Sequence, residues 1–233
     1  MKLLPTALAF LSLLCVGHTA PTTNCESLTQ KIDIESRDLL LGKWMYVAES
    51  TTMPGTKMLT KKFVDSSFVN VMPLPDSRSV EFTQIQKSFG SCISLSSTVQ
   101  VANNTMEMTK PFSASEVLLT TGCPDCLVVL GNFTLGSTYF QSLQLLSRRR
   151  MLSTAELDEF KKQAECMKLL APAFMDPEKE LCPEEQATGT IDLTAVLNTE
   201  TGSKVRAYLD SIISNPDGLG GFFFGNMPRA KED

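Results

Sequence analysis

The sequence predicts an all-β protein: an eight-stranded up-and-down antiparallel β-barrel with one C-terminal α-helix packed on its wall, plus a C-terminal extension. Three observations lead to this fold class. Residues 42–148 are a succession of short segments rich in Val, Ile, Thr, Phe and Tyr. Gly, Pro, Asn, Asp and Ser separate these segments, and an amphipathic helical segment follows the last of them. Eight short strands joined by such turns are typical of a sandwich or an up-and-down barrel.

Period-two alternation indicates which strand faces turn inward. In the third segment Val80 and Phe82 share one face, and in the fifth Met106 and Met108 lie opposite Glu107. The eight expected strands are residues 43–50, 66–72, 78–86, 92–101, 105–109, 115–121, 126–133 and 138–146.

The eighth segment favours a barrel, because neither of its faces is polar. Tyr139, Gln141 and Leu143 share one face, and Phe140 and Leu146 lie on the other. Covering on both sides fits a barrel whose interior holds side chains or a ligand and whose exterior is partly roofed.

The roof is expected directly after the eighth strand. Ser153 and Glu156 have the spacing of a capping box, which predicts a helix that starts there. Cys166 falls inside this helix. Its apolar stripe would pack on the barrel wall and consists of Leu157, Phe160, Ala164, Met167 and Ala171.

The two ends of the chain differ from the middle. Residues 1–20 place Lys2 before a short apolar run and end in small residues, as a cleaved secretory signal peptide does. We therefore expect a secreted, extracellular protein with its domain at residues 21–185 and no transmembrane segment. Residues 186–233 read as a partly helical, partly disordered extension that contains the apolar stretch "GLGGFFFG".

Charge and histidine content exclude several functions. The 233-residue chain has 21 Lys and Arg against 26 Asp and Glu, so its net charge is negative. Cleavage after residue 20 would remove Lys2 and make the chain more acidic. Such acidity argues against nucleic acid as a partner. The single histidine is His18, beside the expected cleavage site, so histidine-dependent catalysis and histidine-ligated zinc are excluded in the mature chain. We predict no catalytic residue, no metal and no cofactor.

Two further features agree with secretion. An even number of cysteines, six, remains after the signal peptide, and in an oxidising compartment this predicts three disulfides whose pairing the spacing does not fix. Asn103 and Asn132 each begin an Asn-x-Thr sequon, so we expect a glycoprotein.

The order of these features carries a resemblance. Gly42 and Trp44 form a Gly-x-Trp motif at the first strand, and Arg148 directly follows the eighth, before the helix. This ordered set resembles the lipocalin family, in which the tryptophan closes the narrow end of the barrel and the arginine lies over it. The family's aspartate turn before the seventh strand is matched loosely by Asp125 in "CPDCLVV". We expect the two arginines after Arg148 to be solvated.

Within the family the likeness is to the plasma branch that contains alpha-1-acid glycoprotein and apolipoprotein M, with toxin-binding relatives. It runs over residues 25–185 and rests on "LGKWMYVAES", "GCPDCLVVL" and "AECMKLLAPAFMDPEKELCPEE". This branch implies that Cys25 pairs with Cys166 and Cys92 with Cys182. The remaining two, Cys123 and Cys126, then pair most simply with each other, because they lie close together in "CPDC". A redox function is the alternative for this C-x-x-C, which lacks the strand-to-helix setting that lowers a thiol pKa.

The resemblance implies transport of a small hydrophobic ligand in the barrel by a monomeric carrier. Tyr46 and Ala48 would face inward beyond Trp44. The residues we predict to line the ligand site are Tyr46, Val80, Phe82, Met106, Met108, Val129, Tyr139, Gln141 and Leu143. Plain core is the alternative interpretation for each of them.

Two rival functions stay open. Some lipocalins are isomerases that use a free cysteine inside the pocket. A barrel filled with side chains would instead leave the helix face and the tail to dock on a protein or a lipoprotein particle.

Overall fold

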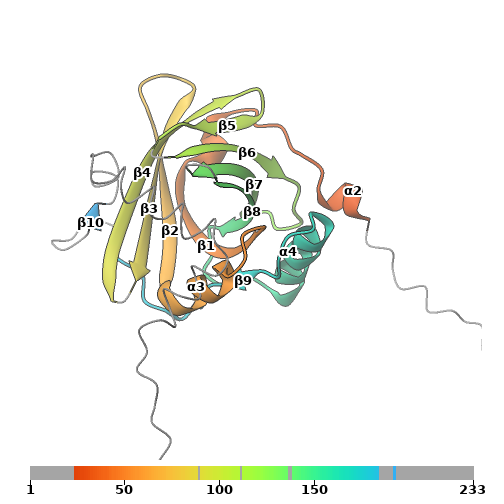
Figure 1. Ribbon diagram of the computed structural model, residues 1–233. Helices are drawn as coiled ribbons and strands as arrows, with labels where there is room; N and C mark the ends of the chain where they lie inside the picture. The colour runs from red at the N-terminus through yellow and green to blue at the C-terminus, as the bar shows by residue number, and fades with distance from the viewer. Residues whose placement is uncertain (1–23, 89, 111, 136–137, 184–190, 193–233) are drawn as a thin grey trace, which may run out of the picture.

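Eight antiparallel strands form a closed barrel in the computed structural model, which describes residues 24–88, 90–110, 112–135, 138–183 and 191–192. Strands adjacent in sequence are adjacent in the barrel, β8 pairs with β1, and pairing of β4 with β5 completes the ring. Figure 1 shows the strands surrounding an interior. The strands are β1 (Gly42–Thr51), β2 (Ser66–Pro73), β3 (Ser79–Ser88), β4 (Ser91–Ala102), β5 (Thr105–Met108), β6 (Ser113–Leu119), β7 (Cys126–Leu135) and β8 (Thr138–Ser147).

This architecture confirms the predicted fold class, and each of the eight expected strands is present. The apolar residues separate into two layers. One layer fills the interior of the barrel and includes Trp44, Val80 and Leu118. The other lies outside the wall of β1, β7 and β8, where it would meet water without a cover.

Helix α4 (Thr154–Cys166) supplies that cover. The Ser153 side chain accepts from the Glu156 amide while the Glu156 carboxylate accepts from the Ser153 amide, so the predicted capping box is formed. Phe160 is buried on the outer layer, as expected. The expected apolar stripe is longer than the helix, which ends at Cys166. Lys168 adopts a left-handed φ of 58° just after this end, so Ala171 lies outside the helix.

Helix α3 (Thr56–Phe63) was not predicted, because we expected only a turn at Pro54 and Gly55. Gly55 stands at its N-cap with φ 84°, a conformation that favours glycine. The helix packs against β1 and the short strand β9 (Ala173–Phe174), which itself pairs with β1. A second short strand, β10 (Ile191–Asp192), pairs in parallel with β4.

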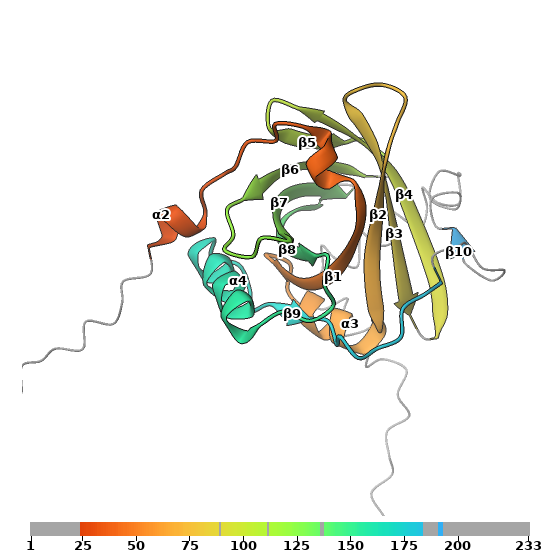
Figure 2. The same cartoon turned by 180° about the vertical axis from the view of Figure 1, so that it is seen from behind.

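The N-terminal segment crosses the barrel before β1 begins. Figure 2 shows it in red and orange, running from α2 (Cys25–Leu28) beside α4 to the 3₁₀ turn η1 (Arg37–Leu40). The Ile32 amide donates to the Leu118 carbonyl at 3.0 Å, which fastens this segment to β6.

All three expected disulfides are present. Cys25 pairs with Cys166 and joins α2 to α4, and Cys92 pairs with Cys182 and joins β4 to the segment after β9. The third bond, Cys123–Cys126, closes the turn before β7. No helix within the described residues is long and apolar enough to span a membrane. The expected signal peptide lies outside the described residues, as do residues 186–190 and 193–233 of the expected extension.

Candidate ligand cavity

The barrel encloses a cavity of about 120 Å³. A second compartment of about 250 Å³ shares five of its lining residues, so the two adjoin. The walls are mainly aliphatic, aromatic and methionine side chains. The inner cavity is lined by Leu40, Trp44, Tyr46, Val69, Phe82, Gln84, Leu95, Ser97, Val99, Met106, Met108, Phe112, Glu116, Leu127, Val129, Phe133, Gln144 and Leu146.

Trp44 is buried in the barrel interior and forms part of the cavity wall. Its ring is 3% exposed, and its indole N–H donates to the Leu40 carbonyl at 2.7 Å. The Arg148 guanidinium covers the ring, 3.4 Å from its centroid. Gly42 makes room for this arrangement, because a Cβ there would lie 3.0 Å from Arg148 Nη1 and its φ is 93°. Arg148 therefore lies over Trp44, as the resemblance implied.

A β-bulge decides which β1 side chains reach the cavity. Tyr46 pairs with Leu146, but Ala48, two residues on, pairs with the adjacent Leu145. A bulge inserts one extra residue and so reverses the alternation beyond it. Ala48 consequently lies in the outer layer under α4, and our expectation that it faces inward is wrong. Glu49 instead lines the outer compartment.

Glu49 is held by hydrogen bonds inside this apolar surrounding. Its Oε1 accepts from the Ser142 hydroxyl at 2.8 Å, and its carboxylate also accepts from the Tyr46 hydroxyl. Burial raises the pKa of Glu49, and the two hydrogen bonds oppose that rise. Burial also raises the pKa of Tyr46, and the nearby charges of Glu49 and Glu116 raise it further.

Glu116 is a second carboxylate on the cavity wall. It lies on β6 opposite Met106, and its side chain is half-buried. Burial raises its pKa to about 7, with a smaller contribution from the charge of Glu107. A Cβ at Gly131 on β7 would come within 3.1 Å of Glu116 Cγ and 2.5 Å of the Phe133 ring, so this glycine leaves space for both side chains.

Five of the nine predicted ligand residues line the cavity: Tyr46, Phe82, Met106, Met108 and Val129. Val80 is fully buried in the interior layer without bordering the cavity. That these residues bind a ligand stays a prediction.

The predicted face of β8 is wrong. Tyr139 is 66% exposed, Gln141 donates to Asn132 Oδ1 at 3.1 Å, and Leu143 is buried in the layer under α4. Gln144 and Leu146 of β8 line the inner cavity, and Phe140 lines the outer compartment. Both faces of this strand are apolar because α4 covers the outer one, so alternation could not distinguish them.

Sequence reasoning missed both acidic residues of the cavity. Glu116 shares the period-two face of Leu118, which belongs to the interior layer, so alternation in "SEVLL" could have placed it. For Glu49 no such signal existed, because the preceding bulge is set by pairing with β8.

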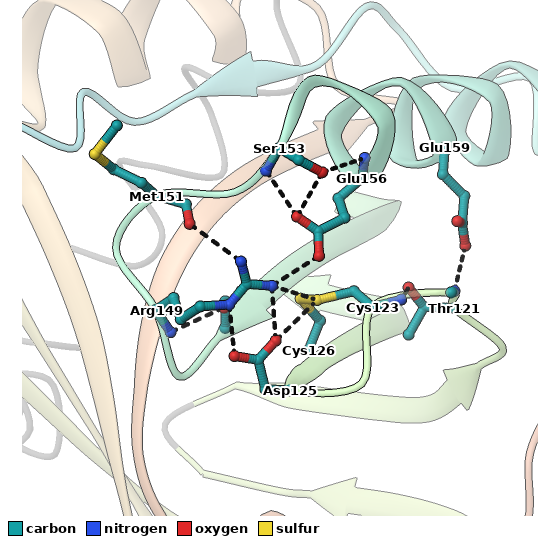
Figure 3. The surroundings of a disulfide bond; sticks show 11 residues. Thr121, Cys123, Asp125, Cys126, Arg149, Met151, Ser153, Glu156 and Glu159 are labelled. Carbon is teal, nitrogen blue, oxygen red and sulfur yellow. Dashed lines mark hydrogen bonds and ion pairs between the residues drawn. A yellow bond between two sulfur atoms is a disulfide. The ribbon is translucent and has the colours of Figure 1, made fainter.

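A polar cluster at the Cys123–Cys126 turn joins α4 to the barrel. Figure 3 shows Arg149 between Asp125 and Glu156. Arg149 binds the Asp125 carboxylate through two nitrogens, at 2.6 and 2.8 Å, and Glu156 at 2.7 Å. Arg149 is exposed, as expected of a solvated side chain, and the two ion pairs are what the sequence did not predict. Arg149 lowers the pKa of both acids, and they raise its own.

This cluster is structural. Cys123, Asp125 and Cys126 bring three potential metal donors together, but both sulfurs are consumed by the disulfide and offer no thiolate. The six cysteines of the described residues all form disulfides. Arg150 is exposed, as expected, and donates to the Lys179 carbonyl.

The two sequon asparagines have different surroundings. Asn103 is exposed in the turn between β4 and β5, with φ 52°. Asn132 is half-buried on β7, where Oδ1 accepts from the Tyr139 hydroxyl at 2.7 Å. Glycosylation of either stays a prediction.

Comparison with known proteins supports the fold. No protein-family model matches the chain, and no curated protein sequence matches it. The solved structure of the siderocalin Ex-FABP, which functions through dual ligand specificities, is similar with a TM-score of 0.55 and 16% identity. The match covers 64% of this chain and 98% of the other. Barrel, helix and this similarity together define a lipocalin fold.

Proposed function

We propose that the protein is an extracellular carrier that binds a small hydrophobic molecule inside its barrel. The observation that carries this proposal is the cavity above the Trp44 floor, which is largely apolar and adjoins an outer compartment. Apolar ligand surface that leaves water there contributes roughly 25 cal/mol per Å². Flexible Met106 and Met108 in the wall suit ligands of varied shape.

The extracellular setting belongs to the same proposal. Three disulfides are typical of oxidising compartments. The apolar N-terminal 20 residues have the composition of a signal peptide. We further propose that the protein belongs to the plasma branch of lipocalins, on the pairing of Cys25 with Cys166 and of Cys92 with Cys182 that its resemblance implied.

The two rivals have less support. An isomerase that uses a free pocket cysteine needs a thiol, and each cysteine within the described residues is bonded to another. A docking module with a filled barrel needs no cavity, whereas about 120 Å³ of the interior is open.

A matched pair of variants tests the carrier function. Ser97 borders the cavity on β4, and the next residue, Thr98, is exposed on the outside. We expect Ser97→Phe to fill the cavity and Thr98→Phe to leave it open. Native mass spectrometry of protein from an animal cell secretion system should find a bound small molecule on the wild type and on Thr98→Phe, and little on Ser97→Phe.

Quenching of Trp44 fluorescence by a panel of lipids gives a second readout, since this tryptophan is the only one in the chain and lines the cavity. A barrel that binds no member of the panel, or equal binding by both variants, would contradict the proposal.

A further inference from the structure

A groove lies outside the barrel, between helices α3 and α4. Figures 1 and 2 both show the short strand β9 between these two helices. The groove has a volume of about 430 Å³, which is larger than the inner cavity of the barrel. None of its lining residues borders either compartment of the barrel cavity, so the groove is a separate feature of the molecule.

Apolar side chains form the floor of this groove. Ala164 of α4 is buried there, Leu169 and Phe174 are half-buried, and Leu170 is 46% exposed. Apolar area that lines a concave surface is favourable to cover, because the covered area leaves water. The floor therefore suits an apolar chain.

Three lysines border the same groove. Lys57 and Lys61 lie one turn apart on α3, and neither forms an ion pair with a described residue. Lys161 of α4 pairs with Asp158 on its own helix, in an exposed contact of the kind that contributes little. Glu165 is the one acidic side chain among the described residues of the groove. Positive charge thus dominates this site on an acidic protein, which favours an anion.

A second pocket extends the groove along an apolar path. It has a volume of about 230 Å³ and shares Lys57, Leu170 and Ala171 with the groove. Met53 lines this pocket, and Glu49 also borders it. Because Glu49 is acidic, an anionic group belongs in the groove beside the lysines, and an apolar chain can continue into the second pocket.

We propose that the groove binds a single-chain amphiphile with an anionic head, of the fatty-acid type. The head pairs with Lys57 and Lys61, and the chain covers Leu170 and Phe174. Its burial contributes roughly 25 cal/mol per Å² of apolar surface. A lipid bilayer fits less well, because its surface is broad whereas these lysines border a concave groove. The site goes beyond the carrier function proposed above and does not depend on it.

Calorimetric titration of the full-length secreted Ser97→Phe protein measures this site apart from the cavity, which that substitution is expected to fill. Decanoate and decanol, of one chain length, are titrated near neutral pH, where the carboxylate is ionised. Both stay below the critical micelle concentration. We expect one decanoate per protein, bound about fivefold or more tightly than decanol. Higher ionic strength should weaken the binding of decanoate and leave that of decanol unchanged.

Two pairs of lysine substitutions locate the anionic head. Lys57→Gln combined with Lys61→Gln should weaken decanoate binding by about fivefold or more, to near the affinity of decanol. Lys62→Gln combined with Lys162→Gln removes the same charge from the same two helices, outside the groove, and should change the affinity by less than about twofold. All four lysines are exposed, so both variants should fold, which thermal melts verify.

A second matched pair locates the chain. Ala171 is exposed and borders both the groove and its extension, whereas Ala155, exposed on α4, borders neither. Ala171→Phe should fill the path and weaken the binding of both decanoate and decanol. Ala155→Phe should leave both affinities unchanged.

The outcomes separate this inference from the carrier function, which the Trp44 and mass-spectrometric measurements test independently. Decanoate that does not bind to Ser97→Phe, or binds no more tightly than decanol, overturns the inference. So does an affinity that the substitutions at Lys57 and Lys61 leave unchanged.

Two other occupants of the groove give distinct results. Sedimentation with phosphatidylcholine vesicles that contain phosphatidylserine tests a membrane surface. Vesicle binding that requires Lys57 and Lys61, in the absence of decanoate binding, would overturn the inference in favour of a membrane. A dimer in solution that Ala171→Phe dissociates would overturn it in favour of a second copy of this chain.

Discussion

The Arg148 guanidinium lies over Trp44 and also donates to two backbone carbonyls, those of Lys43 at 2.8 Å and Leu41 at 2.5 Å. One side chain thus fixes the tryptophan ring and both residues that flank the start of β1. A lysine carries the same charge but cannot stack a planar group and bridge two carbonyls at once.

We therefore expect Arg148→Lys to lower the free energy of unfolding by about 1–2 kcal/mol. Denaturant unfolding followed by Trp44 fluorescence measures this change. Arg78→Lys, at an exposed side chain with no hydrogen bond in the described structure, is the control and should change stability by less than about 0.5 kcal/mol. Equal effects of the two substitutions would show that the stacking contributes nothing.

Gly42→Ala should destabilise the protein through both strain and contact. Gly42 and Gly90 have similar positive φ values, 93° and 75°, but only at Gly42 would a Cβ meet the Arg148 guanidinium. The strain alone costs about 1 kcal/mol, so Gly90→Ala should cost that amount and Gly42→Ala more. Thermal melts compare the two variants.

A double-mutant cycle isolates the contact. In an Arg148→Ala background, Gly42→Ala should cost no more than Gly90→Ala does in the wild type. If Gly42→Ala still destabilises the protein more than Gly90→Ala in that background, contact with Arg148 is not the cause of the additional destabilisation.

Arg149→Gln should weaken the attachment of α4 to the barrel, because Asp125 and Glu156 both lose their partner. The pKa of each acid is lowered in the folded state, so this stabilisation is present above their ordinary values of 3.8 and 4.5 and is lost as the pH falls below them. The stability difference between wild type and variant should accordingly shrink towards pH 3.

Lys161→Gln is the matched comparison on the same helix. It breaks an exposed pair with Asp158 whose two side chains are each 47% exposed, and such pairs contribute little. Chemical denaturation at several pH values should show a smaller effect for Lys161→Gln. The reverse order would contradict a role for Arg149 in joining the helix to the turn before β7.

Glu116→Gln should stabilise the ligand-free protein at high pH. The folded pKa of about 7 lies above the ordinary 4.5, so the folded state holds a proton that the unfolded state has lost between these values. Stability of the wild type relative to the glutamine variant is thus full below about pH 4.5 and declines up to pH 7.

Above pH 7 we expect the variant to be more stable by about 3 kcal/mol, which is roughly the free energy that a rise in pKa from 4.5 to about 7 represents. Urea unfolding at about pH 4.5, 6 and 8 measures this trend. A stability difference that does not vary with pH would mean that Glu116 titrates as it does in water.

Local sequence patterns predicted the structure correctly where each pattern had a single structural interpretation. The Ser153–Glu156 spacing located the start of α4, and alternation located Phe82, Met106 and Met108 on the cavity wall. The pairing of Cys25 with Cys166 was obtained from a resemblance, because spacing alone allows many connectivities.

Where two readings fitted the same pattern, prediction failed. On β8 both faces are apolar, so Leu143 was assigned to the interior although it lies under α4. The eight residues of α3 contain three lysines and follow a Pro-Gly turn signal, which concealed the helix.

The sequence by itself determined the strands, the turns and the helix of this protein, because periodicity and capping are properties of neighbouring residues. Only the tertiary structure decided that Glu49 and Glu116 border one cavity. The bulge at Val47 that turns Glu49 inward depends on the register of β1 against β8, nearly a hundred residues away in the chain. The open space beside Glu116 depends equally on Gly131 of the neighbouring strand.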